Sequence, residues 1–237
     1  LRAEAGRDLR VRVRALTTLA GLTGSRLGNL PDAVRLQREA EASLEALGGS
    51  PLLLGKLLDN MAAVHFTHRD YGTGLRLSEQ AMPLLQQSLG DDHLDVAIAW
   101  TNRGIALRGL GETRGAIEAQ HRALGIKEHL FGPDHPSVAT SLINLGEAHR
   151  SREEWAEAEV LMRRAIASRE RFFGPTHTEL GGPLINLALI ELAQGRFQAV
   201  KAGLHRVEAL FENRVAPDHP EYRALTQAWN ELRRGRR

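Results

Sequence analysis

The chain has 237 residues, which suits one large domain or two small ones, and 42% of them are hydrophobic. It contains no cysteine, which excludes disulfides and thiol-based metal sites or nucleophiles. Its net charge is only +2, and no apolar run approaches the roughly 18 residues of a membrane span. We therefore expect a soluble, cytoplasmic protein. Because the chain starts at Leu1 instead of Met, we also expect it to be a piece of a longer protein.

Two residue types recur with a period of 42 residues. The histidines of this series are His93, His135, His177 and His219. The asparagines are Asn60, Asn102, Asn144 and Asn186. A fixed period of about 20–50 residues is typical of stacked repeats, whose long surfaces bind other molecules. The period therefore predicts an elongated repeat architecture.

The units can be followed along the chain. The first, residues 4–47, carries the pattern most weakly, since Gly28-Asn29-Leu30 aligns only if one residue is dropped. The second, residues 51–88, lacks a Gly-Pro-Asp-His turn but keeps Asn60 in register. Three units that match each other closely follow, over residues 89–130, 131–172 and 173–214. A last helix over residues 218–234 would cover the exposed face of the fifth unit. We expect one solenoid domain over residues 1–237.

Each unit is predicted to hold two antiparallel helices. In the fourth, Val138, Leu142, Leu145 and His149 follow a single helical stripe, and a second stripe starts at Trp155. The turn before that unit reads Phe-Gly-Pro-Asp-His-Pro, where we expect Asp134 to be the N-cap of the next helix. The fifth unit departs from the pattern, because Pro183 falls inside its first helix. We expect that helix to begin late, near Gly182, or to be kinked.

The pattern Leu-x-Asn-Leu-Gly/Ala, followed by Gly-x-Phe/Trp and then by small residues in the second helix, resembles the tetratricopeptide repeat. The 42-residue period and the Phe-Gly-Pro-Asp-His-Pro turn are similar to the longer variant typified by kinesin light chain, which also occurs in bacterial regulatory proteins. The resemblance is closest over residues 89–214. It implies an all-α fold, a right-handed superhelical solenoid (an α-α superhelix) of about five helix pairs and a C-terminal capping helix.

The resemblance also implies that the first helices of the pairs line a concave groove that binds a peptide. The asparagine series occupies a first-helix slot that would face this groove, where an amide can pair with any peptide backbone. Alternatively, the asparagine side chains bridge neighbouring helices. Two arginines near the asparagines would favour an acidic or carboxylate-bearing ligand. The candidate peptide-binding residues are Asn60, Asn102, Asn144, Asn186, Arg108, Arg150, Lys56 and Glu147.

We find no catalytic pattern, since the sequence has neither a phosphate loop nor Gly-x-Ser-x-Gly. The repeated histidines stand on separate units on the order of 10 Å apart, too far to surround one ion with bonds of roughly 2.0–2.1 Å. We expect them to bond to nearby backbone in the turns. The sequence thus predicts a protein that is not an enzyme and that has no cofactor and no metal.

The favoured function is a protein–protein interaction scaffold, the sensor or recruitment arm of a bacterial regulatory protein, with a protein or peptide as ligand. Two alternatives stay open. One is self-association into a homo-oligomer through the first repeat, whose outer face we expect to be apolar. The other, less favoured, is nucleic-acid binding through Arg-rich ends. These ends carry Arg2, Arg7, Arg10, Arg12 and Arg14, and Arg233, Arg234, Arg236 and Arg237.

Overall fold

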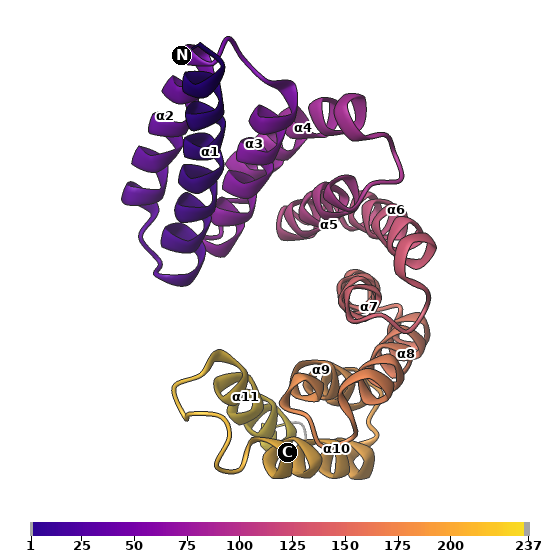
Figure 1. Ribbon diagram of the computed structural model, residues 1–237. Helices are drawn as coiled ribbons and strands as arrows, with labels where there is room; N and C mark the ends of the chain where they lie inside the picture. The colour runs from indigo at the N-terminus through magenta and orange to yellow at the C-terminus, as the bar shows by residue number, and fades with distance from the viewer. Residues whose placement is uncertain (1, 235–237) are drawn as a thin grey trace. The chain divides into compact units, whose positions relative to one another are not determined.

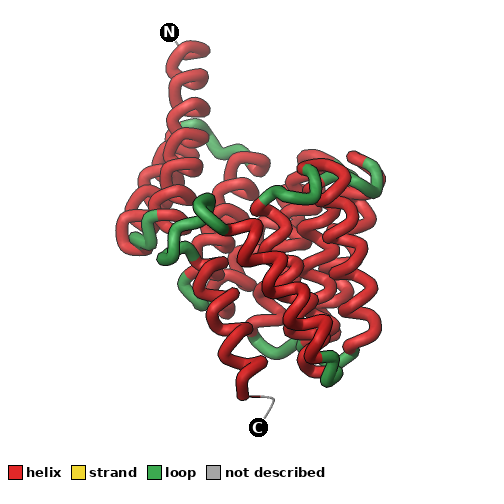
Figure 2. Tube along the Cα trace, turned by 90° about the horizontal axis from the view of Figure 1, so that it is seen from below, coloured by secondary structure: helices red, strands yellow, loops and turns green. Residues whose placement is uncertain are grey.

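The computed structural model describes residues 2–234, and the side chains of residues 6–234. These residues form helices joined by short turns (Figure 1), and no strand occurs among them (Figure 2). The all-α prediction is therefore confirmed. The helices are α1 (Arg2–Gly21), α2 (Leu30–Ala46), α3 (Pro51–Thr67), α4 (Tyr71–Leu89), α5 (Leu94–Gly109), α6 (Thr113–Phe131), α7 (Pro136–Arg150), α8 (Trp155–Phe173), α9 (Gly181–Ala193), α10 (Phe197–Phe211) and α11 (Pro220–Arg234).

The contacts of the chain divide it into two compact units, Leu1–Ile126 and Lys127–Arg237. In the first unit, α1 pairs with α2 and α3 pairs with α4, while α3 also contacts α1, α2 and α5. In the second unit, α7 pairs with α8 and α9 with α10, and α11 packs on both α9 and α10. Consecutive helices joined by short turns thus form the antiparallel pairs that the sequence predicts (Figure 1).

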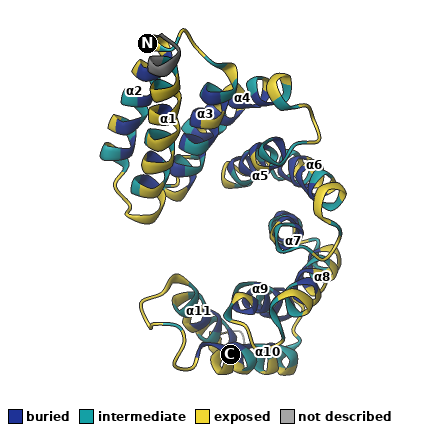
Figure 3. Ribbon diagram, viewed as in Figure 1, coloured by how far each residue is buried: buried dark blue, intermediate teal, exposed yellow. Residues whose placement is uncertain are grey.

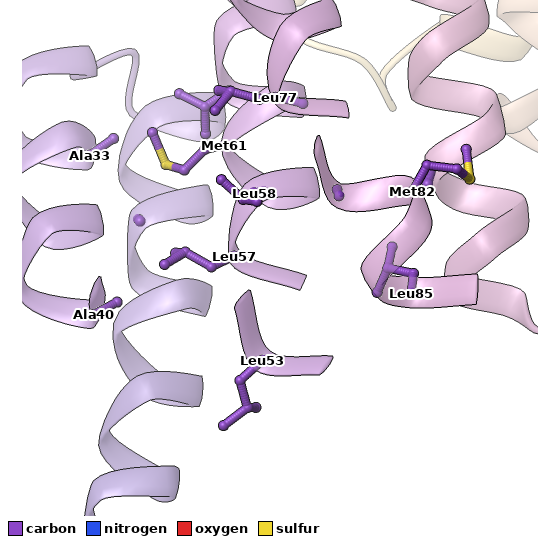
Figure 4. Close-up of a cluster of buried hydrophobic side chains, with 14 of the residues drawn as sticks. Ala33, Ala40, Leu53, Leu57, Leu58, Met61, Leu77, Met82 and Leu85 are labelled. Atoms are coloured by element: carbon purple, nitrogen blue, oxygen red, sulfur yellow. The ribbon is translucent and has the colours of Figure 1, made fainter. Parts of the chain in front are cut away.

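The core of the first unit is a continuous apolar cluster between the helices. Figure 4 shows Ala33 and Ala40 of α2 beside side chains of α3, with Leu57 pointing toward the preceding helix pair. Leu57 and Met61 are fully buried. Burying one such side chain contributes roughly 1.5–3 kcal/mol, whereas an isolated helix of this length is only marginally stable in water. Stacking of one pair on the next therefore stabilises the array.

The four repeated histidines act as helix N-caps. His93 precedes α5, His135 precedes α7, His177 precedes the 3₁₀ turn Thr178–Leu180, and His219 precedes α11. In every case the imidazole Nδ1 accepts the backbone N–H of the second residue after it, over N···N distances of 3.1–3.3 Å. The expected bond to local backbone is confirmed. The prediction that Asp134 is the N-cap of α7 is wrong, because His135 takes that place while the Asp134 carboxylate pairs with Arg171.

The fifth helix pair begins with the predicted interruption. The 3₁₀ turn Thr178–Leu180 comes first, and α9 begins only at Gly181. Pro183 thereby lies in the first turn of α9, where its missing N–H removes no intrahelical bond. Gly181 is required at this point by packing, since a Cβ on it would overlap the ring of Phe211. The late start of this helix is confirmed.

Candidate functional site

Two of the predicted binding residues, Lys56 and Asn60, lie in a cavity of the first unit. The cavity has a volume of about 540 Å³ and is formed by α1, α3 and α5, with one residue of α4. It follows the first helices of three successive pairs, where the sequence predicts the binding groove. Its lining residues are Arg14, Thr17, Thr18, Leu53, Lys56, Asp59, Asn60, Leu85, Asp95 and Ile98.

Asn60 has a polar atom that the chain itself does not satisfy. Its Oδ1 is buried and has no hydrogen-bond partner among the described residues. The amide lies against α1 at Gly21, where a Cβ would overlap Oδ1. A second cavity of about 250 Å³, bordered by Leu22 and Ser25 among others, also reaches Asn60. Because a buried acceptor without a partner costs roughly 1–3 kcal/mol, a ligand N–H that reached this oxygen would recover that free energy.

Asn102 is engaged within the protein. Its Nδ2 donates to Asp59 Oδ1 over 2.9 Å, so that α5 is tied to α3, and both side chains are buried. Burial raises the pKa of Asp59 to about 6, although the hydrogen bond from Asn102 lowers it, and the nearby Asp95 carboxylate raises it further. This is the helix-bridging arrangement that the sequence left open as the alternative for the asparagine series.

The same arrangement occurs in the second unit. Asn186 Nδ2 donates to Glu147 Oε1 over 3.0 Å, which ties α9 to α7. Asn144 and Arg150 are half-buried on α7, and the Arg150 Nε is buried without a partner among the described residues. Arg108, in the first unit, is half-buried on α5 and lies outside the lining of the 540 Å³ cavity. The members of the predicted site therefore have different surroundings.

The cavity contains an ion pair that a ligand could exchange. Lys56 Nζ lies 2.8 Å from Asp95 Oδ2, which links α3 to α5. Their side chains are 45% and 26% exposed, and a pair as exposed as this is worth about 0–1 kcal/mol. Breaking it to bind a charged ligand group therefore costs little. Asp59, Asp95, Arg14 and Lys56 give the cavity both signs of charge.

Eight of the ten lining residues are not among the candidate peptide-binding residues predicted from the sequence, and three of them show what the sequence could and could not reveal. Thr18 stands 42 residues before Asn60, so it occupies the asparagine slot of the first unit, and the period could have identified it. Arg14 follows by the same reasoning, because it lies one helical turn before Thr18. Ile98 is 38% exposed, which is unusual for an apolar residue in these helices, and the sequence carries no signal for that exposure.

The Arg-rich ends are exposed where the structure describes them. Arg7, Arg10, Arg12 and Arg14 are exposed on α1, and Arg233 and Arg234 are exposed at the end of α11. Arg236, Arg237 and the side chain of Arg2 lie outside the described residues. None of the described helices is long and apolar enough to cross a membrane. Within residues 6–234, no three His, Asp or Glu side chains are grouped so that they could hold a metal ion.

Solved structures with the same fold include the following three proteins. BtubC (BKLC) from P. vanneervenii matches with a TM-score of 0.74 at 23% identity, over 92% of each chain. The nearly identical TPR-like repeats of a Podosopora anserina kinesin light chain match at 0.70 and 19% identity, over 86% of this chain and 98% of that one. Aspartyl phosphate phosphatase F from Bacillus subtilis matches at 0.73 and 14% identity, over 98% of this chain and 63% of that one.

At these identities the likeness concerns the fold. No curated protein matches the sequence. A family model described as Tetratricopeptide repeat matches residues 53–129 and 115–171, which together cover half of the chain. Tetratricopeptide repeats are scaffolds for protein–protein interaction, and both the helix pairs and the 42-residue period agree with that family. The chain therefore belongs to the tetratricopeptide repeat family, with repeats of the kinesin-light-chain type.

Proposed function

We propose that this domain, taken as one module over residues 1–237, binds an extended segment of a partner protein in the cavity formed by α1, α3 and α5. The observation that carries the proposal is the buried Asn60 Oδ1, which has no donor among the described residues and belongs to a side chain that borders two adjacent cavities. An extended peptide offers a backbone N–H and C=O at every residue, so it can supply this donor whatever its sequence.

The remaining lining supports the same kind of ligand. Ile98, which is 38% exposed, offers an apolar surface for one side chain of the peptide, beside the buried Leu53 and Leu85. Lys56 and Asp95, which form a partly exposed ion pair in the cavity, can each turn to a charged group of the ligand. The lining as a whole is mixed, with charged and polar side chains beside apolar ones, so it can contact both the backbone and the side chains of a peptide.

The other predicted residues take different parts in the proposal. Asn102 and Asn186 hold neighbouring first helices at a fixed spacing through Asp59 and Glu147. Arg108 in the first unit, and Asn144 and Arg150 in the second, stay proposed ligand contacts, each within its own unit. The half-buried arginines would suit a carboxylate of a ligand.

We infer that the module serves as the sensor or recruitment arm of a bacterial regulatory protein, with recognition rather than chemistry as its task. A Rap protein with the same fold, at 15% identity and a TM-score of 0.70, was solved in complex with Competence and Sporulation Factor. That likeness supports a binding role for helix pairs of this kind.

The test is a selection from a displayed library of random peptides against the full chain, followed by calorimetry of an enriched peptide. Asn60→Ala should weaken binding about three- to tenfold, as expected for the loss of one hydrogen bond. Ile98→Asp should weaken it further, by placing a charge on the apolar wall. Asn186→Ala is the matched control in the second unit and should leave the affinity unchanged. Enriched peptides that bind all three variants as tightly as the parent would refute the assignment.

A further inference from the structure

The outward face of α1 carries an apolar stripe that nothing in the first unit covers. Val11 is 62% exposed, Leu19 49% and Leu22, just beyond the end of α1, 45%. Ala15 is exposed between them. Steps of four, four and three residues place all four on one side of a helix. In Figure 3 much of α1 has the colour of exposed residues, whereas the neighbouring α3 is largely buried.

The repeat register identifies what this stripe is. Forty-two residues later, the same four positions in α3 are 5% exposed or less, and they are Leu53, Leu57, Met61 and Val64. The counterpart of Leu22 packs against the preceding pair, since a Cβ on Gly24 would overlap Val64. In the second unit, α9 likewise buries its counterparts of Leu19 and Leu22. The stripe is therefore the inter-pair packing surface, left open at α1.

The charges around the stripe restrict what can cover it. Arg7, Arg12 and Arg26 are exposed around it, with Arg14 on the side of the cavity, and Asp8 is the one acid among the described side chains of α1. Among the described residues, none of these arginines pairs with a carboxylate. A second copy of the chain would place arginines opposite arginines. A helix with acidic edges would instead find complementary charge.

We propose that the α1 stripe, defined as Val11, Ala15, Leu19 and Leu22, docks an acidic amphipathic helix of a partner protein. The apolar face of that helix takes the place that a preceding helix pair takes on α3, and its Glu or Asp residues face the arginines. None of the four stripe residues lines the peptide-binding cavity of about 540 Å³, although Leu22 borders the smaller cavity of about 250 Å³. The domain would then bind two protein segments at once.

The experiment measures anisotropy of two labelled helical peptides with the full chain. Both carry the same leucine stripe, and the edges are glutamate in one and lysine in the other. The glutamate peptide should bind, more weakly at higher salt, and the lysine peptide should not. Val11→Gln with Leu19→Gln should reduce binding at least about tenfold, since two apolar anchors are lost. Both positions are exposed, so circular dichroism should be unchanged.

Two further variants separate the possible outcomes. Arg7→Glu with Arg12→Glu should exchange the preference, so that the lysine peptide now binds. Asn60→Ala should leave binding of the glutamate peptide intact, which separates this proposal from the cavity assignment. Equal binding of both peptides, or full binding to the Val11/Leu19 variant, would overturn the proposal. So would sedimentation that shows a dimer of the parent chain that the Val11/Leu19 variant abolishes, because a second copy would then be the occupant.

Discussion

The two compact units use the same repeat positions, yet the first unit leaves open what the second closes. Asn60 has a buried oxygen without a partner in its unit, whereas Asn186 donates to Glu147. Leu22 is 45% exposed, whereas its counterpart Ile190 is fully buried. The difference indicates that a repeat position can contact a ligand only where its side chain is not already covered or hydrogen-bonded by a neighbouring helix. This difference is the reason for which we propose that recognition lies in the first unit.

The second unit is closed by its last helix. Leu225, Ala228 and Leu232 of α11 are buried against α9 and α10. The opposite side of α11 presents exposed polar residues such as Arg223 and Gln227. Repeat arrays need such polar outer surfaces at their ends to stay soluble. The helix therefore acts as the cap of the second unit.

The largest expected effect is on stability, and it compares a buried leucine of α11 with an exposed leucine of α1. Leu225→Ala should lower the free energy of unfolding by about 2–4 kcal/mol, because it opens a cavity in the core of the second unit. Leu19→Ala should change it by less than about 0.5 kcal/mol, because Leu19 is half exposed. Urea unfolding followed by circular dichroism measures both. Equal losses would mean that α1 is covered as α11 is.

The second effect is a pH dependence that Asp59 gives to the stability of the first unit. Because burial raises the pKa of Asp59 from 3.8 to about 6, the folded state holds this proton more tightly than the unfolded chain. The stability that Asp59 contributes is full below about pH 4 and is lost as the pH rises through 6. A shift of this size corresponds to about 2–3 kcal/mol.

Asp59→Asn keeps an oxygen for the amide of Asn102 but removes the charge. The variant should be more stable than the parent by about 2 kcal/mol at pH 7, and the two should be equal near pH 3.5. Glu147→Gln, the matched change in the second unit, keeps an oxygen for the amide of Asn186 and serves as the control. Denaturant midpoints of the three proteins, measured from pH 3.5 to pH 7, test this prediction. A parallel profile for Asp59→Asn and the parent would show that Asp59 is not the group responsible.

A smaller effect distinguishes two of the histidine caps. His135→Ala should cost about 1–2 kcal/mol, because it removes the N-cap of α7 and a stacked ring contact with Phe131 at 4.4 Å between centroids. His93→Ala should cost about 1 kcal/mol, since the residue in the place of Phe131 is Leu89. His135→Asn, which can still cap the helix, should recover part of the loss. Thermal unfolding of the three variants measures this, and a neutral His135→Ala would contradict the capping role.

The smallest effect should be the same in both units. Arg69 and Glu153 occupy the same turn position as Gly111 and Gly195, and all four have φ between 60° and 83°. A side chain is strained there, so Arg69→Gly and Glu153→Gly should each stabilise the chain by up to about 1 kcal/mol. Gly111→Ala, the reverse change, should destabilise it. Loss of stability in both glycine variants would mean that other contacts of Arg69 and Glu153 outweigh the strain.

Much of the fold could be predicted because its signals are local. The 42-residue period, the turn prolines and the apolar stripes predict the helix pairs, and Pro183 predicts the late start of α9. The capping residue of α7 could not be assigned correctly, because general capping preferences favour Asp134. The structure instead uses the ring of His135, which also stacks on Phe131.

The candidate site was harder to predict, because its chemistry depends on partners far along the chain. Asn60, Asn102 and Asn186 look equivalent in sequence. Their surroundings differ, however. Asn102 can reach Asp59, 43 residues earlier, with a hydrogen bond, and Asn186 can reach Glu147, 39 residues earlier. Asn60 instead lies against Gly21 of the preceding helix pair. The period identifies which position of the repeat could bind a ligand. The residue opposite it on the neighbouring helix decides whether that position is already hydrogen-bonded within the protein.

The central claim is that ligand recognition lies in the cavity of the first unit. The most direct measurement is site-specific photo-crosslinking of a library-selected peptide, with benzoylphenylalanine placed at position 98 or at position 160. Ile98 lines the cavity, and Val160 is 67% exposed on α8, in the second unit. We predict a crosslink from position 98 and none from position 160. A crosslink from position 160 in the absence of one from position 98 would contradict the claim.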